Sequence, residues 1–183
     1  MKKIRPQKNI LTNRRSFLGG AVMCMAACMP SLSPLRADAA RLEIPMPGPR
    51  DACPVCGMFP ARYPDWVATV LYRDGHAHHF DGAKDMFKYL LDLPKYARDH
   101  RKQDITAIQV TDYYATQRID ARRALYAIGS DVLGPMGHDL IPHPDEYDAK
   151  EFMKDHKGKR LLTFDEVTMK LLLGLDNGEF VLK

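Results

Sequence analysis

The sequence lacks an apolar run long enough to cross a membrane as a helix. The run nearest the N-terminus, residues 17–27, has eleven residues, about half of the roughly 20 that a spanning helix needs. Arg14 and Arg15 lie shortly before this run, and paired arginines ahead of a short apolar stretch are typical of a twin-arginine export signal. We therefore predict that residues 1–39 are an export signal and that the mature protein is periplasmic.

Two positions in this segment fit the end of a signal. Residues 25–28 (MAAC) resemble a lipoprotein box, and cleavage before Cys28 would leave a lipid anchor on that cysteine. Residues 37–39 (ADA) resemble an ordinary small-residue cleavage site before Ala40. The sequence thus predicts a periplasmic protein, either free or anchored to a membrane as a lipoprotein.

The chain also lacks an excess of basic charge once the signal is set aside. The whole sequence has a formal net charge of +4, from 27 Lys and Arg against 23 Asp and Glu. Seven of these basic residues but only one acidic residue lie in residues 1–40, so 20 basic and 22 acidic residues remain and the mature charge is near −2. Such a balance offers no electrostatic attraction for nucleic acid, and we expect no nucleic-acid partner.

Cysteine is scarce in the mature part. Of the 4 cysteines, Cys24 and Cys28 lie in the predicted signal, which leaves Cys53 and Cys56. In an oxidising compartment such a pair can form a disulfide, a redox dithiol or a metal site. The roughly 140 mature residues are enough for a compact core without a disulfide, so stability alone is a weak reason for the pair.

The remaining pattern predicts an α+β fold. Residues 40–51 hold three prolines and a glycine, which favours an extended linker before a domain at 52–183. Apolar and β-branched patterns predict strands at 66–72, 76–80, 105–113, 124–128 and 160–164. Helical spacing predicts helices at 83–93, 144–158 and 166–173, with Asp81 and Asp165 as caps of the first and last. The order indicates two ββα-type units packed into one small domain.

The segment Cys53-Pro54-Val55-Cys56-Gly57-Met58 combines two thiols and a thioether on a predicted turn. Soft sulfur ligands of this kind select Cu(I). The chain has no second C-x-x-C and no histidine pair at finger spacing to complete a closed zinc site. Gly57 and the prolines that follow disfavour the helix that a thioredoxin-like motif would open, so a metal site is the interpretation that fits best.

Met136 differs from the other methionines because it lies on the turn Gly134-Pro135-Met136-Gly137, where no helix or strand pattern would bury it. An apolar side chain presented in this way favours a functional role. His138 is close enough in sequence to add an imidazole to the same ion. In contrast, three methionines follow helical apolar patterns and are predicted to be core residues: Met86, Met153 and Met169.

His76, His78 and His79 lie on the predicted hairpin, and His76 and His78 share one strand face. Three histidines within four positions could form a surface metal patch. On a polar hairpin beside an Asp-Gly turn, we interpret them as solvated side chains.

Three blocks of the sequence together resemble the NosL family, the nitrous oxide reductase accessory lipoproteins, which are periplasmic copper-binding proteins. Their order along the chain is far more specific than a C-x-x-C motif alone. The blocks are residues 53–58 (CPVCGM), residues 66–68 (WVA) running on to 80–89 (FDGAKDMFKY), and residues 134–140 (GPMGHDL).

This resemblance implies a monomeric Cu(I) carrier with two ββα units, which is not an enzyme. Its expected partners are nitrous oxide reductase, whose copper centres it would supply in denitrification, and an ABC-type membrane complex. The resemblance carries Cys56, Met58 and Met136 over as copper ligands, whereas Cys53 matches the motif without a sure role as a ligand. The alternative is a periplasmic thiol–disulfide oxidoreductase acting through Cys53 and Cys56.

Overall fold

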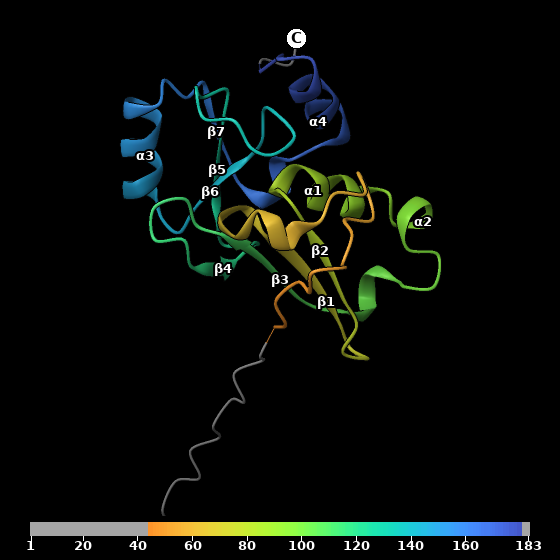
Figure 1. Cartoon of the computed structure of the whole chain (residues 1–183). Helices are drawn as coiled ribbons and strands as arrows, with labels where there is room; N and C mark the ends of the chain where they lie inside the picture. Colours follow the sequence, from red (N-terminus) through yellow and green to blue (C-terminus); the bar gives the residue numbers. More distant parts are fainter. Residues whose placement is uncertain (1–43, 181–183) are drawn as a thin grey trace, which may run out of the picture. The chain divides into compact units, whose positions relative to one another are not determined.

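The computed structural model describes residues 44–180 (Figure 1). The signal predicted at 1–39, including Cys28, lies outside the described residues. The described part contains two antiparallel sheets and four α-helices, which confirms the predicted α+β class. None of the helices within 44–180 has the length and apolar character needed to span a bilayer.

The first sheet holds four antiparallel strands in the order β2-β1-β3-β4. All five residues of β1 are buried, as expected for a central strand covered on both faces. The predicted Asp74-Gly75 hairpin joins β1 to β2, and Gly75 takes a φ of +86° that favours glycine. The strands are β1 (Ala68–Tyr72), β2 (Ala77–Phe80), β3 (Ile105–Thr111) and β4 (Arg118–Asp120).

The second sheet holds three antiparallel strands in the order β6-β5-β7. Its strands are β5 (Leu125–Ile128), β6 (Ile141–His143) and β7 (Arg160–Leu162). Pro142 lies in β6, which is tolerated because β6 is an edge strand. The sequence pattern missed both β4 and β6, since three residues are too few to show an alternating period.

Each sheet carries its own helix. α1 (Ala83–Leu91) packs on β1 and β2, and α3 (Glu146–Asp155) packs on β5 and β6 (Figure 1). These two ββα units match the prediction. α2 (Leu93–Tyr96) follows α1, and α4 (Met169–Asp176) packs against α1 and so links the two halves. Four short 3₁₀ helices complete the fold, at Pro60–Arg62, Pro64–Trp66, Lys102–Asp104 and Phe164–Glu166.

Neither of the two aspartates predicted to cap a helix does so. The N-cap of α1 is Gly82, and no side chain at that position caps the helix. Instead Asp139, from the second half of the chain, accepts a hydrogen bond of 2.7 Å from the backbone N–H of Lys84 in the first turn. Asp165 lies in a 3₁₀ helix, and Thr168 caps α4. The predicted capping by Asp81 was wrong because its carboxylate faces a cysteine, as described below.

One main core joins the two halves. It includes Phe80 and Met86 from the first ββα unit, Tyr126 from β5 and Leu172 from α4. A smaller cluster joins Phe152 of α3 to Ala127 of β5 and Ile141 of β6. Burying a large apolar side chain contributes about 1.5–3 kcal/mol, so the shared core fixes how the two halves pack.

Candidate metal centre

The turn that carries the two cysteines is closed by two backbone hydrogen bonds. The N–H of Cys53 donates to the carbonyl of Met58 at 2.7 Å, and the N–H of Gly57 donates to the carbonyl of Cys53 at 2.9 Å. Gly57 has a φ of +79°, a conformation that L side chains rarely adopt. The turn therefore holds both sulfurs on the side facing the start of α1.

Each thiol meets a carboxylate at that point. The thiol of Cys53 donates to Oδ2 of Asp85 at 3.6 Å, and the thiol of Cys56 donates to Oδ1 of Asp81 at 3.2 Å. One donor atom from each of these four residues lies within 4.8 Å of the other three. Both cysteines are free thiols. Within residues 44–180, this is the one such group of three or more His, Cys, Asp or Glu donors.

Asp81 has a buried oxygen without a partner. The residue is 1% exposed, and its Oδ2 has no hydrogen-bond partner among the described residues. A buried carboxylate oxygen left in this state is costly. A cation held between the thiols and this carboxylate would satisfy it, so the donor set fits a metal ion.

Burial dominates the ionisation of the two thiols. It raises the pKa of Cys53 to about 11, although the backbone N–H groups of Cys56 and Val55 lower it in part. Burial raises the pKa of Cys56 still further, partly offset by the N–H of Met58 and reinforced by the carboxylates of Asp85 and Asp81. Both thiols are therefore protonated at neutral pH in the metal-free protein, and a metal ion has to displace these protons.

A hollow with a volume of about 440 Å³ opens beside Cys56. Met136 lines it from the Gly134–Gly137 turn and Met169 lines it from the start of α4. Met136 is 45% exposed. The hollow thus brings a thiol together with two thioethers from the other half of the chain, and its remaining lining residues are Val55, Asp85, Lys88, Asp92, Lys95, Tyr96 and Leu173.

The turn that presents Met136 is tightly closed. The N–H of Gly134 donates to the carbonyl of Gly137 at 2.8 Å, and the reverse bond measures 3.1 Å. Gly137 has a φ of +80°. Two hydrogen bonds within four residues leave the Met136 side chain at the tip of the turn.

Lys84 ties this turn to α1. Its Nζ donates to the carbonyl of Met136 at 2.9 Å and lies 3.1 Å from Oδ1 of Asp176 on α4. The Lys84 side chain is 2% exposed, so its charge is buried and needs these partners. A lysine on α1 therefore sets where the Met136 turn lies relative to the thiols.

Asp139 anchors the other end of the same loop. Its Oδ1 accepts the backbone N–H groups of Lys84 and Leu140, each at 2.7 Å. Burial raises the pKa of Asp139 to about 7, against the effect of these two N–H donors and of the Lys84 charge. A Cβ added at Gly82 would collide with Oδ2 of Asp139, so glycine is required at that position.

The structure brings together some of the residues predicted from the sequence. Cys53 and Cys56 lie in one cluster, and Cys56 and Met136 line one hollow. Met58 is partly buried on the cysteine turn but does not line the hollow. His138 does not line it either, and its ring packs on Phe180 with 4.9 Å between ring centres.

Sequence reasoning missed Asp81, Asp85 and Met169. Asp81 directly precedes a helix, where an aspartate is expected as a cap, and Met169 has the spacing of a core residue. Met86, Met153 and Met169 do pack in or against the two cores, as predicted, and Met169 lines the hollow as well. A carboxylate pair four residues apart at a strand-to-helix junction was the signal available for Asp81 and Asp85, because such a spacing places both on one side of the first turn.

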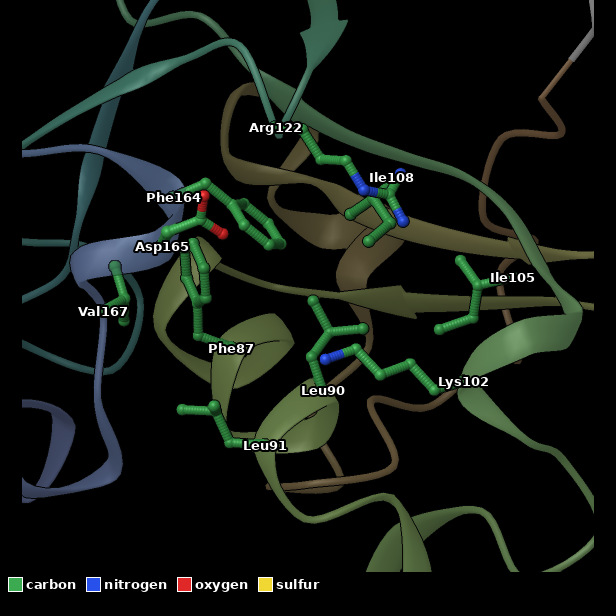
Figure 2. A pocket seen from close by; sticks show the side chains of 10 residues that line it. All are labelled: Phe87, Leu90, Leu91, Lys102, Ile105, Ile108, Arg122, Phe164, Asp165 and Val167. Carbon is green, nitrogen blue, oxygen red and sulfur yellow. The ribbon is translucent and has the colours of Figure 1, made fainter.

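A second hollow lies on another side of α1 and is mainly apolar (Figure 2). Phe87, Leu90 and Phe164 line it, with Lys102 and Arg122 at its edge. It contains no thiol, thioether or imidazole, and its one carboxylate is that of Asp165. Its chemistry therefore does not suit a metal ion.

The chain is similar to known proteins across most of the described region. The sequence profile of the NosL family matches residues 46–172. The copper-binding lipoprotein NosL of Stutzerimonas stutzeri is 30% identical over 129 residues, which make up 67% of this chain and 64% of that protein. The match thus spans slightly less than two thirds of the relative's length.

A solved structure agrees with the fold. The crystal structure of the copper chaperone NosL from Shewanella denitrificans superposes with a TM-score of 0.57 at 25% sequence identity, covering 69% of this chain and 96% of that one. The solution structure of the apo-NosL protein from Achromobacter cycloclastes gives a TM-score of 0.40 at 21% identity, covering 60% of this chain and 87% of that chain.

Proposed function

The chain belongs to the NosL family, and on that premise we propose that it is a periplasmic metallochaperone that binds Cu(I). Its proposed role is to supply copper for assembly of the copper centres of nitrous oxide reductase. The proposed ligands are Cys56, Met58 and Met136, with Cys53 as a neighbouring thiol. The relatives' names, copper-binding lipoprotein and copper chaperone, support the copper part of this role.

The observation that carries the proposal is the cluster of two free thiols beside a hollow that two thioethers line. Thiolate and thioether sulfurs are the donors that favour Cu(I). Met136 and Met169 lie in the same hollow as Cys56, so a single ion can reach sulfur from both halves of the chain. Met169 is therefore an additional proposed ligand.

The exposure of the site suits a carrier. A carrier must release its ion to a partner, and a ligand at the surface makes that transfer possible. Met136 is 45% exposed on its turn, whereas Cys53 is 2% exposed. We propose that the buried thiols retain the ion and that the partner displaces Met136 first.

The state of the thiols disfavours the alternative of a thiol–disulfide oxidoreductase. Attack on a disulfide requires a thiolate, and redox cysteines have lowered pKa values. Here burial raises the pKa of Cys53 to about 11 and that of Cys56 further. A binding protein, rather than an enzyme, is the proposal that this chemistry supports.

Zinc is the competing metal. Two thiols and two carboxylates make up a four-donor set of a kind that Zn²⁺ also accepts. This set weakens the sequence argument against zinc, which relied on too few ligands. The thioethers support the choice of Cu(I) in this proposal, because soft thioether sulfur suits Cu(I), whereas the usual zinc ligands are thiolate, imidazole and carboxylate.

Anaerobic titration with Cu(I) against a competing chelator tests the proposal. We expect Cys56→Ser to weaken Cu(I) binding about 100-fold or more, and Met58→Leu, Met136→Leu and Met169→Leu to weaken it about tenfold each. Zn²⁺ affinity should stay unchanged in the three methionine variants. Met86→Leu is the matched control, since Met86 is fully buried in the core.

If all three methionine variants bind Cu(I) as tightly as the parent, the proposed site is wrong. If Cys53→Ser abolishes function while copper affinity stays unchanged, the oxidoreductase becomes the better interpretation.

The protein that receives the copper, here called the client, and the location of the mature chain need separate tests. We propose that the mature protein is a monomer, that it acts with an ABC-type membrane complex, and that it is either free in the periplasm or anchored through lipid on Cys28. Mass spectrometry of the mature N-terminus distinguishes the two locations. Transfer of copper from the loaded protein to copper-free nitrous oxide reductase tests the client, and a lack of transfer would refute it.

A further inference from the structure

Three histidine side chains lie close together at the other end of β2, at the hairpin between β1 and β2, although they do not form a ready group of converging donors. His76 and His78 are on this hairpin, and His100 reaches them from the loop after α2. The ring centres are 4.6 Å apart for His76 and His78, 5.1 Å for His76 and His100, and 5.7 Å for His78 and His100. The three rings therefore all contact one another.

These separations match those of imidazoles that share an ion. In a tetrahedral zinc site the ligand nitrogen lies about 2.0–2.1 Å from the ion. The ring centre lies about 1.1 Å farther out, so rings at tetrahedral angles around one ion have centres about 5 Å apart. The three observed values lie on both sides of this distance. The rings of His76 and His100 are nearly parallel, at 22°, so all three imidazoles can share an ion only if at least one of these rings turns.

The surroundings favour a cation. His100 Nε2 lies 3.6 Å from Oδ2 of Asp74, and a carboxylate on one ring nitrogen orients the other for a metal. A hollow of about 390 Å³ beside His100 is lined by three carboxylates, those of Asp74, Asp99 and Asp104, against one cation, Arg73. The negative field of this hollow would attract a metal ion from solution.

The imidazoles are held in place on their inner side. His78 is partly buried, and its ring packs on Tyr72 and Tyr89 with 6.0 Å and 5.2 Å between ring centres. His76 is exposed and has room to turn. His78, held by packing, and His76, exposed and able to turn, are together suited to capture of an ion.

We propose that His76, His78 and His100 form a second metal site, for a divalent ion of the class that imidazole binds. Within that class Cu(II) should bind more tightly than Zn(II), because affinity at nitrogen sites rises to a maximum at copper. We call the group of Cys53, Cys56, Asp81 and Asp85 the sulfur cluster and the hollow beside Cys56 the sulfur hollow. The histidine site is separate from both and does not depend on the proposed Cu(I) function.

The test uses the mature protein in a Cys53→Ser/Cys56→Ser background, so that the sulfur cluster takes no ion. Zn(II) is titrated against a chromophoric chelator, and Cu(II) is followed by electron paramagnetic resonance, in which nitrogen hyperfine structure reports imidazole ligands. We expect one equivalent of either ion, and a loss of roughly tenfold or more in affinity for each of His76→Ala and His100→Ala. His156→Ala, at the end of α3, should change nothing.

A second measurement avoids any dependence on how the cysteine variant folds. Wild-type protein preloaded with Cu(I) is titrated with Zn(II) and followed by the histidine ring resonances in NMR. Shifts confined to His76, His78 and His100 support the site. The absence of such shifts, or binding that survives loss of all three imidazoles, overturns it.

Discussion

The sulfur cluster and the histidine cluster lie at opposite ends of the same short segment. Residues 76–85 supply His76 and His78 to one cluster and Asp81 and Asp85 to the other. The sulfur cluster is buried, with Cys53 at 2% exposure and one carboxylate oxygen without a partner. The histidine cluster is partly exposed. Burial fixes the donors of the first, whereas the second can adapt its rings to an ion.

The two clusters also differ in what builds them. All residues of the histidine cluster come from the first half of the chain, between Tyr72 and Asp104. The sulfur hollow needs Met136 and Met169 from the second half. Changes at the contact between the halves should therefore damage the sulfur site and spare the histidine site. The following predictions test that distinction.

Gly82→Ala should have the largest effect. The new Cβ would collide with Asp139, which cannot withdraw without losing its hydrogen bonds to the N–H groups of Lys84 and Leu140. We expect a loss of about 3 kcal/mol in the free energy of unfolding and weaker Cu(I) binding. Urea denaturation and chelator competition measure the two effects.

Gly137→Ala is the control for this substitution. An added Cβ at Gly137 meets nothing within 4 Å, although its φ of +80° is unfavourable for alanine. We expect a cost of about 1 kcal/mol. Equal losses in the two variants would show that the contact with Asp139 is unimportant.

Lys84→Met should have the next largest effect. The substitution keeps most of the unbranched side chain but removes the hydrogen bond to the Met136 carbonyl and the ion pair with Asp176. We expect a loss of about 2 kcal/mol in stability and about tenfold in Cu(I) affinity, with Zn(II) binding at the histidines unchanged. Lys150→Met, which breaks an exposed pair with Glu146, is the control and should cost less than about 0.5 kcal/mol. Cu(I) affinity equal to that of the parent would show that Lys84 does not position the turn.

The sequence predicted the sulfur atoms better than their surroundings. Cys56 and Met136 stood out because their residue types and turns are locally unusual. Asp81 pairs with Cys56 across 25 residues, and apart from its spacing to Asp85 nothing local distinguishes it from a helix cap. His100 is a single histidine in a charged loop, so its contact with His76 depends on the path of the chain after α2. Of the hairpin histidines interpreted as solvated, His79 is buried against Thr69, so that interpretation was wrong for it, and His76 and His78 became a candidate site through the contact with His100.

Acid should lower the free energy of unfolding, and His143 in β6 offers a test of this effect in the second half of the chain. Burial lowers the pKa of His143 to about 4. Between about pH 6.5 and pH 4 the unfolded chain therefore binds a proton that the folded chain does not, so stability falls as the pH falls through this window. His143→Phe should reduce that loss, by about 1–2 kcal/mol at pH 5 relative to pH 7.

His143 also has no hydrogen-bond partner for either ring nitrogen within the described residues, so the Phe variant should be at least as stable as the parent at pH 7. Urea denaturation at several pH values measures both effects. His143→Gln separates titration from packing, because glutamine is polar but does not titrate. If the free energy of unfolding falls with pH as steeply in both variants as in the parent, His143 is not the group responsible.

Tyr89→Phe should have the smallest effect, and it tests whether the two clusters are independent. Tyr89 lies between them: its ring packs on His78 on one side and on Tyr96, which lines the sulfur hollow, on the other. Its hydroxyl shares a buried hydrogen bond of 2.6 Å with the hydroxyl of Tyr72, so its loss should cost about 1 kcal/mol in unfolding free energy. Because the ring itself remains, we expect less than about a twofold change in metal affinity at either cluster. A larger change at both would mean that the tyrosine pair couples the two sites, and that an ion bound at the histidines alters how tightly the sulfurs hold copper.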